Sequence, residues 1–173
     1  MHRAIEWSQR ALDWARSQRG ASFDQLLGLP FNIGRIEGGI KGNVIAPSCD
    51  LRFGFRPLPG QSVDDLLAMF RGMASPRDLS ALEELFRGPP LPAGDGADAS
   101  RQLLQAQALA QRLGLPTGAA VNFWTEASLF SRAGCTALVY GPGDIAQAHA
   151  ANEWVALAEL SEVAAQYLRL IDA

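Results

Sequence analysis

His149 is one of only two histidines in the chain, and it lies in a loop-like stretch, Gln147-Ala148-His149-Ala150-Ala151-Asn152-Glu153. A neutral imidazole is a common zinc ligand, but a catalytic zinc ion usually has about three protein ligands. No second His or Cys stands at ligand spacing from His149. The residues therefore predict at most one ligand of a metal site, and the alternative is that His149 is an ordinary solvent-exposed histidine.

Two other loop segments carry groups that could contact a ligand. Thr125-Glu126 follows one apolar segment, and Gly141-Pro142-Gly143 follows another. Glycine allows a backbone to approach a ligand closely, although a plain strand exit explains Gly141 and Gly143 equally well. The second loop lacks the Gly-Lys-Ser/Thr ending of a phosphate-binding loop, so it does not predict a nucleotide site.

Arg56 ends a stretch in which apolar and polar residues alternate strictly from residue 50 onward. This period is typical of a strand with one buried face, and Arg56 closes the polar face. A guanidinium there could bind a substrate carboxylate through two parallel hydrogen bonds, or it could be an ordinary surface charge. Upstream, Gly38-Gly39 predicts a hairpin turn, with Asn43 at the edge of the turn.

The elements expected in the first half follow the order helix, strand, strand, helix, strand. An amphipathic helix is indicated by the spacing of Ala4, Trp7, Ala11, Trp14 and Gln18. Strands are expected over 31–36 and 43–56, and the second is interrupted at Pro47. Ser62 is expected to cap a helix over 63–70, and residues 79–86 are expected to form a last strand. One additional strand in front would complete a βαββαβ plait. We therefore expect a plait-like α+β lid that lacks its first strand.

Residues 88–99 are rich in Gly and Pro, and we place a domain boundary there, with domains at 1–92 and 93–173. The second domain should contain helices over 101–113, 126–133 and 155–171 and strands over 119–124 and 136–140. Consecutive apolar residues in both strands are typical of a parallel sheet covered on two faces. Because two such strands leave open edges, we expect an αβαβα piece of a larger α/β domain.

The overall composition favours a small-molecule or protein partner. The chain has 173 residues, 48% of them hydrophobic and 19% charged, and a formal net charge of −3. The absence of a Lys/Arg run argues against nucleic acid and anionic membranes, and no apolar stretch reaches the roughly 18 residues of a membrane span. No signal-peptide core follows Met1, so we expect a cytoplasmic protein. Cys49 and Cys135 are expected to be buried free thiols.

Five motifs, taken in order, resemble one family of enzymes. They are Gly38-Gly39-Ile40-Lys41-Gly42-Asn43-Val44-Ile45-Ala46-Pro47, Arg56-Pro57-Leu58-Pro59-Gly60, Thr125-Glu126-Ala127, Gly141-Pro142-Gly143 and Ala148-His149-Ala150-Ala151-Asn152-Glu153. Their order and spacing resemble the C-terminal portion of the acetylornithine deacetylase, succinyl-diaminopimelate desuccinylase and carboxypeptidase G family of metal-dependent amidohydrolases. Thr125-Glu126-Ala127 is more similar to the deacetylases than to the desuccinylases.

This resemblance implies a catalytic α/β domain that holds two divalent metals, zinc or cobalt, and a plait-like lid that forms a homodimer. It implies that His149 is a metal ligand, and that Asn43, Arg56, Thr125, Gly141 and Gly143 contact substrate, Asn43 across the dimer. The implied substrate is N-acetylated ornithine or citrulline, in arginine biosynthesis. The implied reaction is amide hydrolysis by a metal-bound water and a glutamate general base.

The resemblance also places the family's other functional residues outside the chain. Four features of the family are expected upstream of Met1: its His-x-Asp motif, its Glu-Glu pair with the general base, the next acidic ligand, and the lid histidine that stabilises the oxyanion. We therefore assign no catalytic residue here, and we expect the chain alone to be inactive and to bind metal weakly. The alternative is a non-catalytic module that homodimerises; translating the DNA upstream of Met1 would separate the two.

Overall fold

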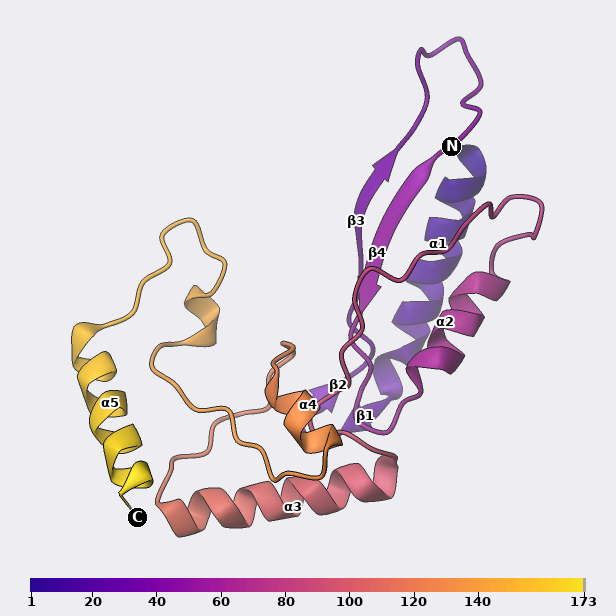
Figure 1. Cartoon of the computed structure of the whole chain (residues 1–173). Helices are drawn as coiled ribbons and strands as arrows, with labels where there is room; N and C mark the ends of the chain where they lie inside the picture. The colour runs from indigo at the N-terminus through magenta and orange to yellow at the C-terminus, as the bar shows by residue number, and fades with distance from the viewer. Residues whose placement is uncertain (173) are drawn as a thin grey trace.

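A computed structural model describes residues 1–172 and has a mixed α/β fold (Figure 1). Its helices are α1 (His2–Ser17), α2 (Val63–Gly72), α3 (Gly96–Leu113), α4 (Ala127–Arg132) and α5 (Leu157–Ile171), with short 3₁₀ turns at Gln18–Gly20 and Ile145–Gln147. Its strands are β1 (Ser22–Phe23), β2 (Leu26–Leu27), β3 (Phe31–Glu37) and β4 (Asp50–Phe55). Within residues 1–172 they form two antiparallel pairs, β1 with β2 and β3 with β4.

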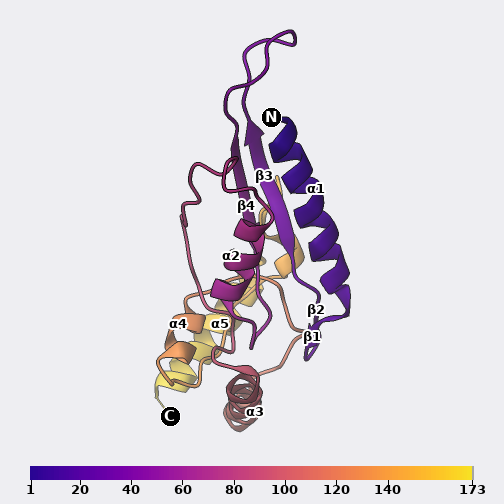
Figure 2. The same ribbon diagram turned by 90° about the vertical axis from the view of Figure 1, so that its right-hand side faces the viewer.

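The first half is a hairpin covered by two helices, as the sequence predicts. β3 and β4 pair from Phe31 opposite Phe55 to Glu37 opposite Asp50, with a bulge between Ile33 and Arg35. α1 and α2 lie along the hairpin (Figure 2). The alternation in β4 directs its apolar side chains towards these helices, which leaves the polar face uncovered by them.

Phe70 of α2 is the centre of the core of this half. It is 1% exposed, and its ring lies 5.0 Å from that of Phe31 and 5.4 Å from that of Trp14. The other members are Ala11, Leu29 and Leu66, with Trp7, Trp14, Phe31, Phe53, Phe55, Met69 and Met73 packed against them. Burying a phenylalanine in this way stabilises the fold by about 1.5–3 kcal/mol.

Ser62 caps α2 as predicted. Its hydroxyl accepts a hydrogen bond from the backbone N–H of Asp65 at 3.2 Å, and Asp64 and Asp65 place negative charge at the positive end of the helix. This cap fixes where the chain turns from the end of β4 into α2. The short β1–β2 ribbon, by contrast, was not predicted, because two-residue strands have no measurable period.

Two strand predictions in the first half are wrong. The second strand begins at Asp50 rather than at Asn43, because a turn in which the Val44 N–H donates to the Lys41 carbonyl, followed by Pro47, occupies residues 41–49. Residues 79–86 form no strand, because a strand requires a neighbour for its hydrogen bonds and nothing within residues 1–172 pairs with this segment.

The three helices of the second half lie close to their predicted positions. α3 begins at Gly96, five residues early, because the carboxylate of Asp95 accepts hydrogen bonds from the N–H groups of Ala97 and Asp98, at 3.0 and 2.9 Å. It ends where Gly114 adopts a left-handed conformation, φ 66°. α4 and α5 begin one and two residues after their predicted starts.

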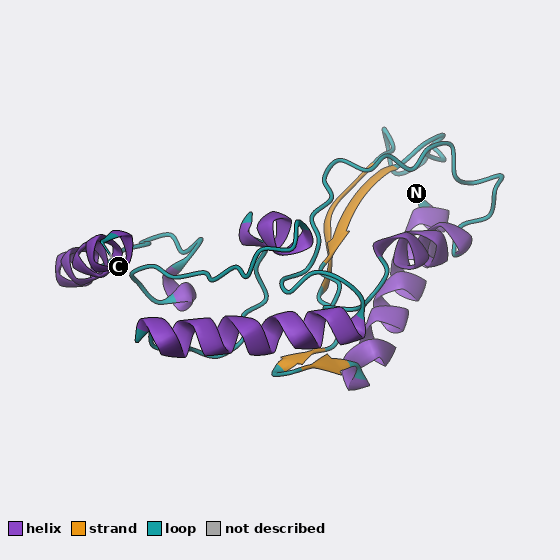
Figure 3. Ribbon diagram, turned by 60° about the horizontal axis from the view of Figure 1, so that its bottom comes forward, coloured by secondary structure: helices purple, strands orange, loops and turns teal. Residues whose placement is uncertain are grey.

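The two parallel strands predicted for the second half are absent from the described residues. Residues 119–124 and 136–140 carry no strand, and the second half consists of helices joined by loops (Figure 3). The two segments do not pair with each other, and no third segment pairs with either. Their apolar side chains consequently face solvent: Val121 is 41% exposed and Val139 is 51% exposed.

Two smaller predictions can be compared with the structure. Cys49 is partly buried and Cys135 is exposed, and both are free, so the expected burial is wrong for Cys135. Among residues 1–172, no helix has the length and apolar character needed to cross a membrane.

Candidate functional site

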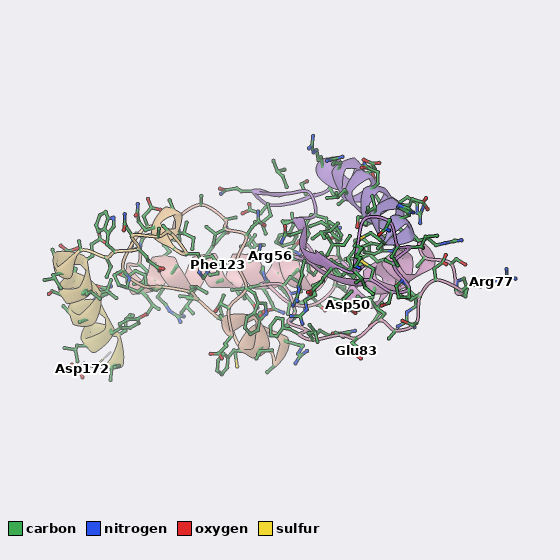
Figure 4. All side chains as sticks on the ribbon, turned by 90° about the horizontal axis from the view of Figure 1, so that it is seen from above. Asp50, Arg56, Arg77, Glu83, Phe123 and Asp172 are labelled. Carbon is green, nitrogen blue, oxygen red and sulfur yellow. The ribbon has the colours of Figure 1, made fainter. Side chains whose placement is uncertain are left out.

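A large open cavity lies between β4 and the segment formed by residues 79–91. Its volume is about 2060 Å³, and it continues to the loop that precedes α4. We call the part between residues 50–55 and 79–87 the β4 groove, and the part around residues 56 and 121–128 the junction end. In the view from above, Arg56 and Phe123 lie towards the junction end, while Asp50 and Glu83 lie at the groove (Figure 4).

Arg56 stands at the junction end, directly after β4. Its backbone N–H donates to the Pro30 carbonyl at 2.9 Å, which extends the hairpin by one residue and fixes the backbone at Arg56. Beyond it the chain is anchored by Leu58, which is 3% exposed and whose N–H donates to the Gln61 side chain. The guanidinium is exposed and lines the cavity, so it is accessible to an anionic ligand.

Thr125 lines the same cavity from the start of α4. Its hydroxyl accepts a hydrogen bond from the Ala127 N–H at 3.1 Å, and its carbonyl accepts one from the Ser128 N–H at 3.1 Å. The hydroxyl hydrogen remains available to donate to a ligand. Ser128, the second residue of α4, is 1% exposed, and its hydroxyl has no partner within residues 1–172 although the residue lines the cavity.

Aromatic side chains that the sequence analysis did not single out form part of this wall. Phe123 and Trp124 both line the cavity, and the ring of Trp124 meets that of Phe86 edge to face at 4.8 Å. Gly88 lies against the indole of Trp124, so closely that a Cβ at residue 88 would overlap it. The sequence feature that could have identified this wall is the aromatic pair immediately before Thr125. Such a pair is equally typical of the buried core of a strand.

His149 lies apart from this cavity, in the loop between residues 141 and 156. Its φ of 60° is uncommon for a residue with a side chain. Its backbone N–H donates to the carboxylate of Glu153 at 3.1 Å, which supports that conformation. The imidazole itself is exposed, so it is accessible to a metal or to a second protein surface.

Gly141 and Gly143 belong to the same loop as His149. Gly143 has φ 92°, a conformation that glycine adopts without strain, and its N–H donates to the carboxylate of Glu159 in α5 at 2.9 Å. This amide is therefore already used within the chain. Tyr167 and Arg169 of α5 bind the carbonyls of Tyr140 and Leu113, which holds the helix beside the loop.

Asn43 lies at the opposite end of the β3–β4 hairpin from Arg56. It is exposed in the loop that joins β3 to β4, which projects beyond the hairpin (Figure 1). The structure thus brings together Arg56 and Thr125 on one cavity, places Gly141, Gly143 and His149 on another loop, and leaves Asn43 separate.

The described residues do not provide a two-metal centre. No group of three or more His, Cys, Asp or Glu side chains within residues 1–172 is arranged to hold a metal ion. A metal site that includes His149 would need ligands from other polypeptide, and no catalytic step through a metal follows from this geometry.

One cluster of ion pairs lies at the β4 groove. Arg87 binds Glu84 through both side-chain oxygens and Asp64 of α2 at 2.8 Å. The hydrogen bonds from Arg87 hold the pKa of Glu84 below its ordinary value of 4.5, and those from Glu84 and Asp64 raise the pKa of Arg87. This pairing ties residues 84–87 to the start of α2.

The helix and hairpin unit of the first half has a counterpart among known protein families. Residues 2–80 match the peptidase dimerisation domain family, a span that contains α1, both antiparallel pairs and α2. Most of the lid-type domain predicted from the sequence is therefore similar to a peptidase dimerisation domain.

The whole chain is similar to longer proteins that are described as deacetylases. It is 56% identical, over 99% of its length, to the N-acetyl-L-citrulline deacetylase of Xanthomonas campestris pv. campestris. It is also 36% and 35% identical, each over 72% of its length, to the acetylornithine deacetylases of Edwardsiella ictaluri and Erwinia tasmaniensis. The chain is therefore similar to these deacetylases, and it corresponds to a C-terminal portion of the Xanthomonas protein.

The match does not extend over the whole of these relatives. The chain spans 47% of the Xanthomonas protein and 32% of each of the two acetylornithine deacetylases. The family resemblance noted in the sequence is confirmed, while the roles of Asn43, Arg56, Thr125, Gly141, Gly143 and His149 remain predictions.

Proposed function

We propose that this chain is the C-terminal portion of a metal-dependent deacetylase that hydrolyses an N-acetyl amino acid, acetylcitrulline or acetylornithine. The observation that carries the proposal is the 56% identity to N-acetyl-L-citrulline deacetylase along 99% of the chain. Of the two substrates, acetylcitrulline is favoured, because the identity to the acetylornithine deacetylases is 35–36% and covers less of the chain.

In this proposal the residues of the chain bind and orient the substrate. Arg56 holds the substrate carboxylate through charge-assisted hydrogen bonds, and the Thr125 hydroxyl, which lines the same cavity, donates a further hydrogen bond. His149 completes a two-metal centre, of zinc or cobalt, whose other ligands belong to the remainder of the enzyme. When bound, the metals would activate water for attack on the acetyl carbonyl.

The first half supplies the lid and the dimer contact. In this proposal the lid is the unit of α1, β3, β4 and α2, residues 93–173 are a piece of the catalytic α/β domain, and Asn43 at the hairpin tip reaches a second subunit. The match of residues 2–80 to a dimerisation domain supports this arrangement.

A chimera tests the proposal. The chain replaces the matched region of the Xanthomonas enzyme, and hydrolysis of N-acetyl-L-citrulline and N-acetyl-L-ornithine is measured for the chimera and for the chain alone. We expect turnover by the chimera, with acetylcitrulline preferred, and none by the chain alone. A His149→Ala chimera should fold, lose bound metal and lose turnover.

Two results would contradict the proposal. One is a folded, metal-loaded chimera that hydrolyses neither substrate. The other is turnover with stoichiometric tight zinc by the chain alone, which would mean that the chain contains the complete centre.

A second function, a non-catalytic homodimerisation module, is favoured by the family matched by residues 2–80. Light scattering on the chain alone separates the two ideas when it is combined with the chimera. A stable dimer together with an inactive chimera supports the module, whereas an active chimera supports the enzyme portion.

A further inference from the structure

A ring of three hydrogen bonds lies where the two halves of the chain meet. The Ala93 N–H donates to the Ser131 hydroxyl at 3.0 Å, that hydroxyl donates to the side-chain oxygen of Gln102, and the Gln102 amide donates to the Ala93 carbonyl at 3.1 Å. Each member both donates and accepts, so the bonds strengthen one another. We call this ring the linker clamp, because Ala93 belongs to the stretch that joins α2 to α3.

The linker clamp is buried, although it holds a loop. Ala93 is 1% exposed and Ser131 is 2% exposed. Residues 88–94 form neither a helix nor a strand, so the Ala93 N–H and carbonyl belong to no regular hydrogen-bond pattern. Buried backbone groups without a partner are costly, and the side chains of Ser131 and Gln102 supply both partners here. Replacing either side chain by an apolar one therefore leaves a buried backbone group unpaired.

The linker clamp also joins α3 to α4. Gln102 lies in the second turn of α3, and Ser131 lies near the end of α4. α4 begins directly after residues 125–126, and the Thr125 hydroxyl and carbonyl accept hydrogen bonds from its first turn. The place of Thr125 on the cavity therefore depends on the clamp through one short helix.

A second contact connects α3 to Arg56. The turn over residues 57–60 follows Arg56, and it ends against the first residue of α3. Gly60 is so close to Gly96 that a Cβ at residue 60 would lie 2.9 Å from the Gly96 Cα. Gly60 has φ 87°, a conformation that glycine adopts without strain. Arg56 in the first half and Thr125 in the second are thus both held relative to α3.

We propose that Gln102 and Ser131 are positioning residues, which act through the linker clamp to hold Arg56 and Thr125 at the separation that the substrate requires. The part of this proposal that concerns substrate rests on the function proposed above. Among residues 1–172, the side chains that line the cavity include neither Gln102 nor Ser131, so the two act through the backbone.

The expected effect of breaking the linker clamp follows from this arrangement. The linker over residues 88–94 becomes free to change conformation, and the two halves then adopt a range of separations. A substrate that is bound by Arg56 and Thr125 together requires one of these separations. Its apparent affinity therefore falls with the fraction of molecules that have the correct geometry.

The first test measures the separation of the two halves in the full chain, without metal or substrate. Spin labels are attached at Gln9→Cys in α1 and Gln107→Cys in α3, both exposed positions, after Cys49 and Cys135 are replaced by Ser. Double electron–electron resonance gives the distribution of distances between the labels. Excess unlabelled chain ensures that only labels within one molecule are measured. We expect one narrow distribution for the chain with its clamp intact.

Each variant of the linker clamp has a matched control. Ser131→Ala is compared with Ser128→Ala, because Ser128 is equally buried in the same helix but its hydroxyl has no partner within residues 1–172. Gln102→Leu is compared with Gln105→Leu, at an exposed position three residues further along α3. The distance distribution should become about twofold wider for the two clamp variants and stay unchanged for the two controls. Because Gln102 is only half-buried, Gln102→Leu should fold even if Ser131→Ala does not.

The second test is a double-mutant cycle on KM in the chimera. Gln102→Leu should raise KM for N-acetyl-L-citrulline by about 10-fold, and Gln105→Leu should leave it unchanged. In a chimera that already carries Arg56→Ala, the further effect of Gln102→Leu should fall below about twofold, because the contact that the clamp positions is gone. A purely structural role would give the same effect in both backgrounds.

Three results would overturn the proposal. The first is a distance distribution that the clamp variants leave unchanged, and the second is equal widening by Ser128→Ala and Gln105→Leu. The third is a rise in KM from Gln102→Leu that is the same with and without Arg56→Ala. A chimera that hydrolyses neither substrate contradicts the proposed function instead, and the distance measurement still decides whether the clamp holds the two halves.

Discussion

The indole N–H of Trp7 donates a hydrogen bond to the backbone carbonyl of Phe70 over 3.0 Å, joining α1 to α2 across 63 residues of sequence. The same indole packs on Phe53 of β4 at 5.0 Å. Arg10, one turn further along α1, binds the carbonyl of Met73 at 3.0 Å. One face of α1 therefore satisfies carbonyls at the end of α2 while it covers the hairpin.

Replacing Trp7 by Phe should separate these two contributions. Phenylalanine keeps an aromatic ring against Phe53 but leaves the Phe70 carbonyl without its donor, so we expect a loss of about 1 kcal/mol in the free energy of unfolding. Trp7→Ala removes the packing as well and should cost about 3 kcal/mol. Urea unfolding measures both; equal losses would mean that the ring contributes nothing beyond the hydrogen bond.

Two glycines give opposite predictions for the same substitution. Gly88→Ala forces the Trp124 indole or the backbone to move and should destabilise the fold by about 1–3 kcal/mol, with a change in tryptophan fluorescence. Gly72→Ala, at the end of α2, has nothing within 4 Å and should stabilise the fold by about 0.5–1 kcal/mol. A stabilising Gly88→Ala would show that residues 88 and 124 are not in contact.

The pair of Glu84 and Arg87 predicts a pH dependence. Because the folded pKa of Glu84 is lowered, its contribution to stability is present above pH 4.5 and is lost as the pH falls through the folded pKa. Both side chains are exposed, so the contribution is small and salt should reduce it. Glu84→Gln should lower the urea midpoint slightly at pH 7 and not in strong acid. Glu83→Gln removes no ion pair within residues 1–172, so it should leave the urea midpoint unchanged both at pH 7 and in strong acid.

Sequence patterns predicted the first half well because each of its elements carries its own local signal. The three-and-four spacing of Trp7, Ala11 and Trp14 specifies α1, and Ser62 with Asp65 specifies the start of α2. The alternation from Leu51 to Phe55 specifies β4. These signals reflect periodicity and capping, which depend on residues close in sequence.

Predictions that depend on distant partners succeeded less well. The apolar runs at 119–124 and 136–140 predict buried strands, yet a strand forms only where another strand accepts its hydrogen bonds. Prediction of the candidate site from the sequence is limited in the same way, because it also depends on residues that are distant in the chain. Arg56 and Thr125 face one cavity because local turns place them there, whereas the loop of His149 is ordered by its own turns and by the carboxylates of Glu153 and Glu159.

Arg56 and Arg52 provide the sharpest test of the proposed substrate contact, because both are exposed on the polar side of β4 and line the cavity. In the chimera, Arg56→Ala should raise KM for N-acetyl-L-citrulline by about 10- to 100-fold, the effect of losing charge-assisted hydrogen bonds of about 1.5–3 kcal/mol. Arg56→Lys should recover only part of this, because an ammonium cannot bind a carboxylate through two parallel bonds. Arg52→Ala should leave KM within about twofold, since a single exposed charge that makes no ligand contact adds little binding energy. Steady-state kinetics on the three variants decides the matter. If Arg52→Ala and Arg56→Ala raise KM equally, the effect is a general loss of positive potential, and Arg56 does not bind the substrate carboxylate directly.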